Sequence, residues 1–78
     1  MAFVLTDHHL ELANRSGTVH AYSEILLGNT APNEPVLDEE DQRSVVFSVT
    51  GAKLALDSDE AREIISAYED GYFEGWGE

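Results

Sequence analysis

Apolar and polar residues tend to alternate along two N-terminal stretches, 3–13 and 18–27. The residues between them, Asn14-Arg15-Ser16-Gly17, are turn formers, and alternation on both sides of such a turn is typical of a β-hairpin. If Ala13 faces Thr18, the apolar side chains gather on one face, and Glu11 lies beside His20 on the other. We therefore predict a first hairpin over residues 3–27.

A second alternating stretch spans residues 44–56. Val45, Phe47 and Val49 alternate with polar residues before Thr50-Gly51-Ala52-Lys53, and a Gly-X pair at the centre of that segment suits a type II′ turn. This pattern predicts a second hairpin. Residues 28–35 hold both prolines and form an exposed loop, and residues 38–41 either extend this loop or form a short helical turn.

The last part of the chain has the period of an α-helix. Asp57-Ser58-Asp59-Glu60 offers capping residues, and the apolar positions that follow are Ala61, Ile64, Ile65, Tyr68 and Tyr72. At 100° per residue these five fall within a sector of ~100° that would cover a sheet. The helix ends at Gly71 or continues through Tyr72-Phe73. The predicted fold is α+β: a single domain, 1–78, in which an antiparallel four-stranded sheet of two hairpins carries a C-terminal helix on one face.

The charge balance narrows the possible partners. The chain has 16 acidic residues against 4 basic ones, which gives a formal net charge of -12. Such a charge opposes binding to DNA, RNA or an anionic membrane and favours a basic protein surface. The sequence lacks a signal peptide and a membrane-spanning run, so we expect a cytoplasmic protein. We also expect either a monomer or a homodimer.

The acids are concentrated after residue 33, where 13 of the 16 lie. On the predicted helix Asp59, Glu63 and Asp70 project away from the apolar positions, with Glu60 and Glu69 on the two flanks. This ridge covers ~16 Å, about five base steps of a nucleic-acid strand, so it can imitate a phosphate backbone. The predicted partner-binding residues are Asp59, Glu60, Glu63, Glu69 and Asp70 on the helix, Glu34, Asp38, Glu39, Glu40 and Asp41 in a second contact, and Glu74 and Trp76 in the tail.

The acidity can also arise in two ways that involve no mimicry. Any soluble helix can carry an acidic outer face, and Asp59 and Glu60 are favourable at a helix N-terminus. However, Glu69 and Asp70 oppose the helix dipole, and Asp59 repels Glu63 one turn away, so the ridge costs folding free energy. An acid excess with a single lysine is also typical of adaptation to high salt, which predicts carboxylates on every face.

The C-terminal residues Tyr72-Phe73-Glu74-Gly75-Trp76 alternate aromatic, acidic and glycine positions. Aromatic rings beside carboxylates suit the binding of Arg through stacking and ion pairing. Alternatively, the rings of Phe73 and Trp76 fold back and close the small core.

No constellation of residues indicates catalysis or metal binding. His8 and His9 point to opposite faces of a predicted strand, so they cannot chelate one ion together. Asp57-Ser58-Asp59 matches the start of an EF-hand loop, but Arg62 and Tyr68 stand where that loop needs Gly and Glu. A chain of this size leaves little room for a concave site that shifts carboxylate pKa values. We expect no enzymatic activity, no metal and no cofactor.

In size, charge and acidic helix, the chain resembles the small acidic phage-encoded inhibitors that mimic nucleic acid, such as anti-CRISPR proteins and the uracil-glycosylase inhibitor type. The stretch Leu54-Ala-Leu-Asp-Ser-Asp-Glu-Ala61, which leads into Ile64 and Tyr68, carries the resemblance. The resemblance implies a non-enzymatic inhibitor that occupies the nucleic-acid channel of an effector complex. The alternative hypothesis is a small structural or assembly module, such as a phage accessory protein or an antitoxin, that docks through its sheet face or aromatic tail.

Overall fold

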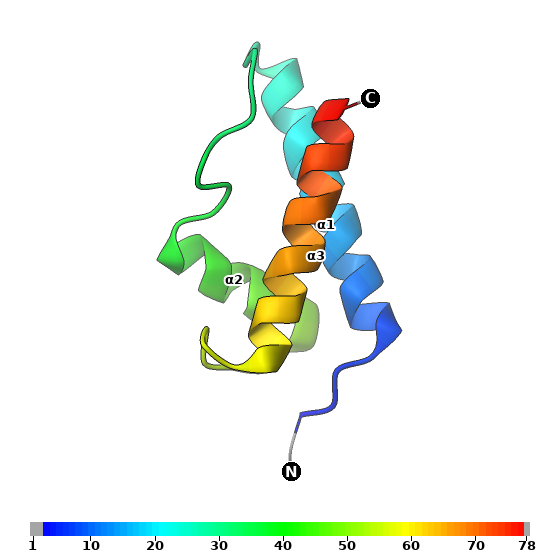
Figure 1. Ribbon diagram of the computed structural model, residues 1–78, viewed down its shortest axis with the longest axis vertical. Helices are drawn as coiled ribbons and strands as arrows, with labels where there is room; N and C mark the ends of the chain where they lie inside the picture. The colour runs from blue at the N-terminus through cyan, green and yellow to red at the C-terminus, as the bar shows by residue number, and fades with distance from the viewer. Residues whose placement is uncertain (1–2, 78) are drawn as a thin grey trace.

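The protein is built from three α-helices. The computed structural model describes residues 3–77, and within that range it contains α1 (Asp7–Leu26), α2 (Glu39–Thr50) and α3 (Asp59–Gly77), with no strand (Figure 1). The predicted α+β fold, with its four-stranded sheet of two hairpins, is therefore wrong. The C-terminal helix is confirmed, and it runs past Gly71 to Gly77.

The two long helices, α1 and α3, lie side by side and run in the same direction (Figure 1). The Asn14 side chain donates to the carbonyl of Ala67 at 3.2 Å, and one turn later the Thr18 hydroxyl donates to the carbonyl of Gly71 at 3.0 Å. A step of four residues along α1 thus matches a step of four along α3. Because parallel neighbours cannot be joined by a short turn, α2 and two connecting segments span the distance between them.

Small residues let the backbones of α1 and α3 come close together. A Cβ added at Gly17 would lie 1.9 Å from the carbonyl oxygen of Tyr68, and one added at Gly71 would lie 1.9 Å from that of Asn14. Ala13 and Ala21 continue the contact on α1, and both are fully buried. The interface therefore excludes larger side chains at these positions.

The same small residues explain why the first predicted hairpin is a helix. The large apolar residues Leu12, Val19 and Leu26 are exposed, whereas the face that contacts α3 is made of Ala13, Gly17 and Ala21. Large apolar side chains therefore do not mark the buried face of α1, and the 3.6-residue period is masked. The supposed turn residues lie in the middle of the helix, where Gly17 serves the close contact.

The second predicted hairpin is replaced by α2 and a loop. Val46, which the strand pattern placed on the polar face, is the buried residue of α2, while Phe47 is about half exposed. Gly51 does need a positive φ, 69°, but it uses this conformation to end the helix. The chain then continues as a loop instead of pairing back as a strand.

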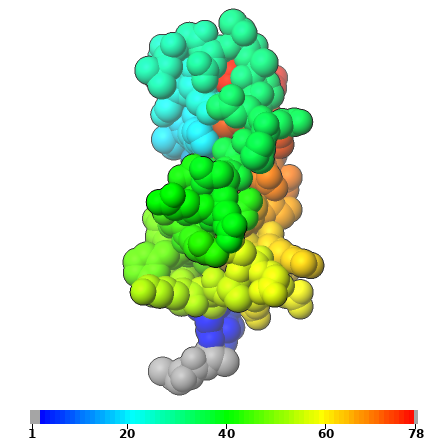
Figure 2. Space-filling view, turned by 90° about the vertical axis from the view of Figure 1, so that its left-hand side faces the viewer, coloured from blue at the N-terminus to red at the C-terminus, as the bar shows by residue number. Residues whose placement is uncertain are grey.

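The C-terminal helix buries the face that its periodicity predicts. Ala61, Ile64, Tyr68 and Tyr72 are buried, and Ile65 packs against them. They pack against α1, α2 and two residues, Val36 and Leu37, of the linker between α1 and α2 (residues 27–38). These elements take the place of the predicted sheet. Figure 2 shows the linker and the start of α2 lying along one side of the long helices.

Candidate functional site

The outward face of α3 carries a row of carboxylates. Asp59, Glu63, Asp70 and Glu74 are all exposed, and at 100° per residue they lie within a sector of ~60° on the side opposite the buried residues of α3. We call these four residues the acidic face. From Asp59 to Glu74 it extends for ~22 Å at 1.5 Å per residue, longer than the sequence predicted, because α3 continues past Gly71 and aligns Glu74 with the other three.

The acidic face is not neutralised by the basic residues of the same molecule. Among residues 3–77 the Arg ion pairs are Arg15–Glu11 and Arg43–Glu39, and His20 contacts Glu24; none of these contacts involves the acidic face. Asp59 and Glu63 are one turn apart, and so are Asp70 and Glu74. Such pairs of like charge repel each other along a helix. Arg62 is the one basic residue of α3, and it forms no ion pair with them.

The other predicted contact residues of α3 lie at the edges of this face or behind it. Glu60 and Glu69 are half-buried. Trp76 is also half-buried, and its ring lies 6.5 Å from that of Tyr72, so it forms part of the packing at the end of α3. Phe73 remains 41% exposed. The aromatic residues are thus the last turns of a helix, with Trp76 packed against the core and Phe73 on its rim.

Part of the second predicted contact, Glu34 to Asp41, caps and stabilises the start of α2. Asp38 caps α2 by accepting the backbone N–H of Asp41 at 2.8 Å, and Glu39 pairs with Arg43 at 2.5 Å. Glu39, Glu40 and Asp41 form the first turn of α2, where acids complement the helix dipole. Glu34 is exposed in the linker.

This segment and the acidic face do not form one array. The start of α2 follows Val36 and Leu37, which pack in one core with Tyr68 and Tyr72 of the buried face of α3. The start of α2 therefore lies on the side of α3 from which the acidic face points away. The protein presents two separate groups of exposed acids.

A buried polar network joins α1, α3 and the linker, and the sequence did not predict it. Glu24 is only 7% exposed. Its carboxylate accepts hydrogen bonds from the hydroxyl of Tyr72, from the Asn33 side chain at 2.7 Å and from His20 Nε2 at 3.1 Å. Tyr72 in turn accepts the backbone N–H of Asn33 at 2.8 Å. The prediction that His20 pairs with Glu11 is wrong, because Glu11 pairs with Arg15.

His20 occupies the centre of this network. Its Nδ1 lies 2.7 Å from the hydroxyl of Tyr68, so a neutral ring can accept from Tyr68 through Nδ1 and donate to Glu24 through Nε2. Every polar atom named in the network then has a partner. The network fixes the linker against the two long helices, and the groups in it are oriented toward one another instead of toward solvent.

The pKa values of the network follow from burial and hydrogen bonding. Burial raises the pKa of Glu24, but hydrogen bonding from Tyr72 and the proximity of His20 outweigh that effect, so the pKa is lowered below 4.5. Burial, together with neighbouring carboxylates, raises the pKa values of Tyr68 and Tyr72 above 10. Glu24 is therefore a buried, ionised and satisfied carboxylate at neutral pH. Within residues 3–77 no three His, Asp or Glu side chains converge as metal ligands would.

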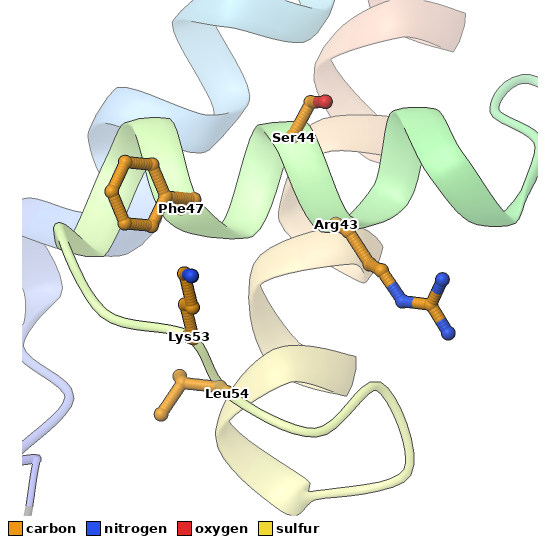
Figure 3. A pocket seen from close by; sticks show the side chains of 5 residues that line it. All are labelled: Arg43, Ser44, Phe47, Lys53 and Leu54. Atoms are coloured by element: carbon orange, nitrogen blue, oxygen red, sulfur yellow. The ribbon is translucent and has the colours of Figure 1, made fainter.

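A surface cleft of about 480 Å³ lies between α2 and the loop that follows it. Arg43, Ser44, Phe47, Lys53 and Leu54 line the cleft (Figure 3). Its floor is mostly apolar, and Arg43 extends away from Phe47 in Figure 3 and pairs with Glu39. None of the predicted partner-binding acids lines it.

No protein-family model, curated protein or solved structure matches the chain. No helix within residues 3–77 combines the length and hydropathy needed to cross a lipid bilayer. The geometry of the chain itself is therefore the basis of the functional proposal.

Proposed function

We propose that this protein is a non-enzymatic inhibitor that binds a basic nucleic-acid-binding groove in place of nucleic acid. The acidic face of α3 is the observation that carries the proposal. Its four exposed carboxylates have no ion-pair partner among residues 3–77, and their length matches about six base steps of a nucleic-acid strand. A CRISPR effector complex is one target class that fits, and we place the activity in the cytoplasm.

Binding would proceed in two stages with different physical causes. The charge of -12 attracts a cationic groove over a distance and accelerates encounter. Carboxylates of the acidic face then pair with Arg and Lys side chains that normally hold phosphates, and desolvated pairs of this kind slow dissociation. Because α3 is packed against α1 from Ala67 to Gly75, the backbone that carries these carboxylates is rigid, and ordering it on binding costs little conformational entropy.

Competition with labelled duplex DNA tests this function. Purified CRISPR effector complexes, nucleases, polymerases and glycosylases are incubated with the labelled DNA, and the protein is titrated in at several salt concentrations. We expect displacement of DNA from at least one of these targets. The apparent affinity should fall about tenfold or more between ~50 and ~200 mM salt, because the contacts are ionic.

A matched pair of variants makes the test specific. Glu63→Gln with Asp70→Asn removes two charges from the acidic face, whereas Asp7→Asn with Glu11→Gln removes two charges from the start of α1. Only the first pair should weaken displacement, by about tenfold or more. Displacement that is insensitive to salt, or equal losses in the two double variants, would refute the proposal, as would the absence of competition with every target.

The alternative, a docking module, lacks the sheet face predicted for it, because residues 3–77 contain no strand. Its aromatic tail is the end of α3, where Phe73 is 41% exposed. A Phe73→Ala variant that loses target binding while the acidic-face variant retains it would favour this alternative.

A further inference from the structure

The outer face of α1 exposes several large apolar side chains. Val19 is 63% exposed, Leu26 87% and Leu27 82%, and Leu12, Tyr22 and Ile25 are exposed by 37–43%. We call Leu12, Val19 and Leu26, with the adjoining Tyr22, Ile25 and Leu27, the α1 stripe. Taking a large side chain as ~200 Å², these fractions present on the order of 700 Å² of surface, more than the largest apolar patch of most monomers.

The stripe has the geometry of a helix-packing seam. Leu12, Val19 and Leu26 follow one another at intervals of seven residues, so they drift by only ~20° per interval around the helix. They lie on the side of α1 opposite Ala13, Gly17 and Ala21, which contact α3. The stripe is therefore straight, ~21 Å long at 1.5 Å per residue, and directed away from the rest of the molecule.

The stripe is also nearly free of charge in a strongly acidic protein. Residues 12–33 contain two charged side chains, Arg15 and Glu24. Glu24 is buried inside the molecule, and Arg15, which borders the stripe, pairs with Glu11. The acidic face lies on the other long helix, about 100° around α3 from Gly71 and Gly75, which contact α1. A second copy of this chain can therefore approach the stripe without bringing the acidic faces of the two molecules together.

We propose that the α1 stripe is a self-association surface on which a second copy of the chain docks, with the two α1 helices antiparallel about a two-fold axis near Val19. The spacing of the stripe is symmetric about this residue, so Leu12 of one copy meets Leu26 of the other. The exposed area approaches the ~800 Å² per partner that a standard interface buries.

The antiparallel arrangement follows from the charges at the start of α1. In a parallel pair Asp7, Glu11 and Arg15 would each face the same residue of the second copy. In the antiparallel pair Arg15 lies opposite Ser23, and the acids lie near the uncharged Leu26–Gly28 end of the partner. The antiparallel pair also opposes the two α1 dipoles, which is favourable.

Analytical ultracentrifugation of the full chain, from about 1 µM to about 500 µM, measures the association. We expect a reversible monomer–dimer equilibrium that strengthens with added salt, because screening reduces the repulsion between two acidic molecules. Val19→Glu should raise the dissociation constant by about tenfold or more. Phe47→Glu, at an apolar residue of similar exposure outside the stripe, should leave it unchanged. Circular dichroism of both variants at low concentration checks that each remains helical.

Disulfide trapping tests the register, since the sequence contains no cysteine. Val19→Cys should form a disulfide-linked dimer on mild oxidation, and so should an equimolar mixture of Leu12→Cys and Leu26→Cys chains. Leu12→Cys alone should remain unlinked, because its own counterpart lies ~20 Å away at the far end of the pair. Linkage of Leu12→Cys to itself would overturn the antiparallel register.

Three further results overturn the self-association surface as a whole. If the chain stays monomeric at about 500 µM in 0.15 M salt, it has no such surface. If the dimer persists in the Val19→Glu variant, the stripe is not its interface. A monomer whose target binding is lost on Val19→Glu would assign the stripe to the target instead. Since the dimer strengthens with salt and target binding weakens with it, failure of one proposal is distinguishable from failure of the other.

Discussion

Gly17 shows how a single hydrogen atom in place of a side chain determines the packing of the molecule. The position where its Cβ would stand lies 1.9 Å from a backbone oxygen of Tyr68, and backbone cannot move aside as a flexible side chain can. Gly71 faces Asn14 in the same way. The helix propensity lost at these glycines, about 1 kcal/mol each relative to Ala, is the cost of bringing α1 and α3 together.

We predict that Gly17→Ala destabilises the protein by about 3 kcal/mol or more, because the helices must separate to admit the methyl group. Gly77→Ala is the matched control, since nothing lies within 4 Å of a Cβ at that position. It should leave stability unchanged or raise it slightly. Urea unfolding followed by circular dichroism measures both variants. Equal effects of the two substitutions would contradict the close contact.

Glu24 is the residue whose ionisation matters most for the fold. Its pKa is lowered in the folded state relative to 4.5, so it stabilises the protein fully above that pH, and this contribution is lost as pH falls through the folded-state pKa. Glu24→Gln should cost about 2–3 kcal/mol at pH 7, because Gln cannot accept the same hydrogen bonds.

The difference between wild type and Glu24→Gln should shrink when the pH falls below about 4.5. Glu34→Gln, at an exposed position in the linker, serves as the control and removes the same charge, so it corrects for the repulsion across the whole molecule that changes with pH. Urea unfolding from pH 7 to pH 3 measures the difference. A difference that is independent of pH would show that Glu24 is not a buried carboxylate in the folded protein.

Among the helices, α3 and α1 differ in how plainly the sequence marks their buried faces. The buried positions of α3 include Ile64, Tyr68 and Tyr72, which are large and recur at helical spacing, so its period was predicted from the sequence. The acidic face follows from the same periodicity, and Asp59, Glu63 and Asp70 were therefore placed on one side. In α1 the buried residues are small, and the hydrophobic pattern indicated strands.

Some features of the site could not be predicted from the pattern of apolar residues. Glu24 resembles any surface acid in the sequence, and its burial depends on the packing of Tyr72 and Asn33 around it. Small residues four apart, at Ala13, Gly17 and Ala21 on one segment and at Gly71 and Gly75 on the other, are a signal that could have indicated two closely packed helices. The parallel direction of the two helices has no comparable signal.

At the level of α3, the acidic face should cost stability as well as bind a target. Asp70 and Glu74 repel each other and lie in the C-terminal half of the helix, where the dipole disfavours acids. We predict that Asp70→Asn with Glu74→Gln raises the melting temperature at low salt by a few degrees, about 0.5 kcal/mol. The gain should diminish in ~0.5 M salt, because screening removes the repulsion.

The same double variant should displace labelled DNA from the target less effectively than the wild type. A variant that gains stability and loses binding would indicate that the charges are retained for function. A variant that loses stability instead would mean that these carboxylates have stabilising partners in the folded protein. The melting temperature, measured at two salt concentrations beside the displacement assay, separates the two outcomes.

The whole molecule has two long sides of opposite character. Exposed carboxylates lie along one side of α3, whereas large apolar residues are exposed on the side of α1 that faces away from α3. Adaptation to high salt predicts carboxylates on every face, and the α1 stripe does not fit that pattern. Two surfaces on different helices can be occupied at the same time, so a pair of molecules joined at α1 would still present two acidic faces to solvent.

The parallel pairing of α1 with α3 also affects how the chain acquires its structure during synthesis. Contacts such as Asn14–Ala67 join residues 53 positions apart, so α1 waits about 3–10 s on a ribosome for its partner at ~5–20 residues per second. During that interval both long sides of α1 are open to water or to a chaperone. Although every element is helical, we expect slower folding than in bundles of sequential antiparallel helices. The contact between α1 and α3 closes the longest loop of the chain, and it forms last.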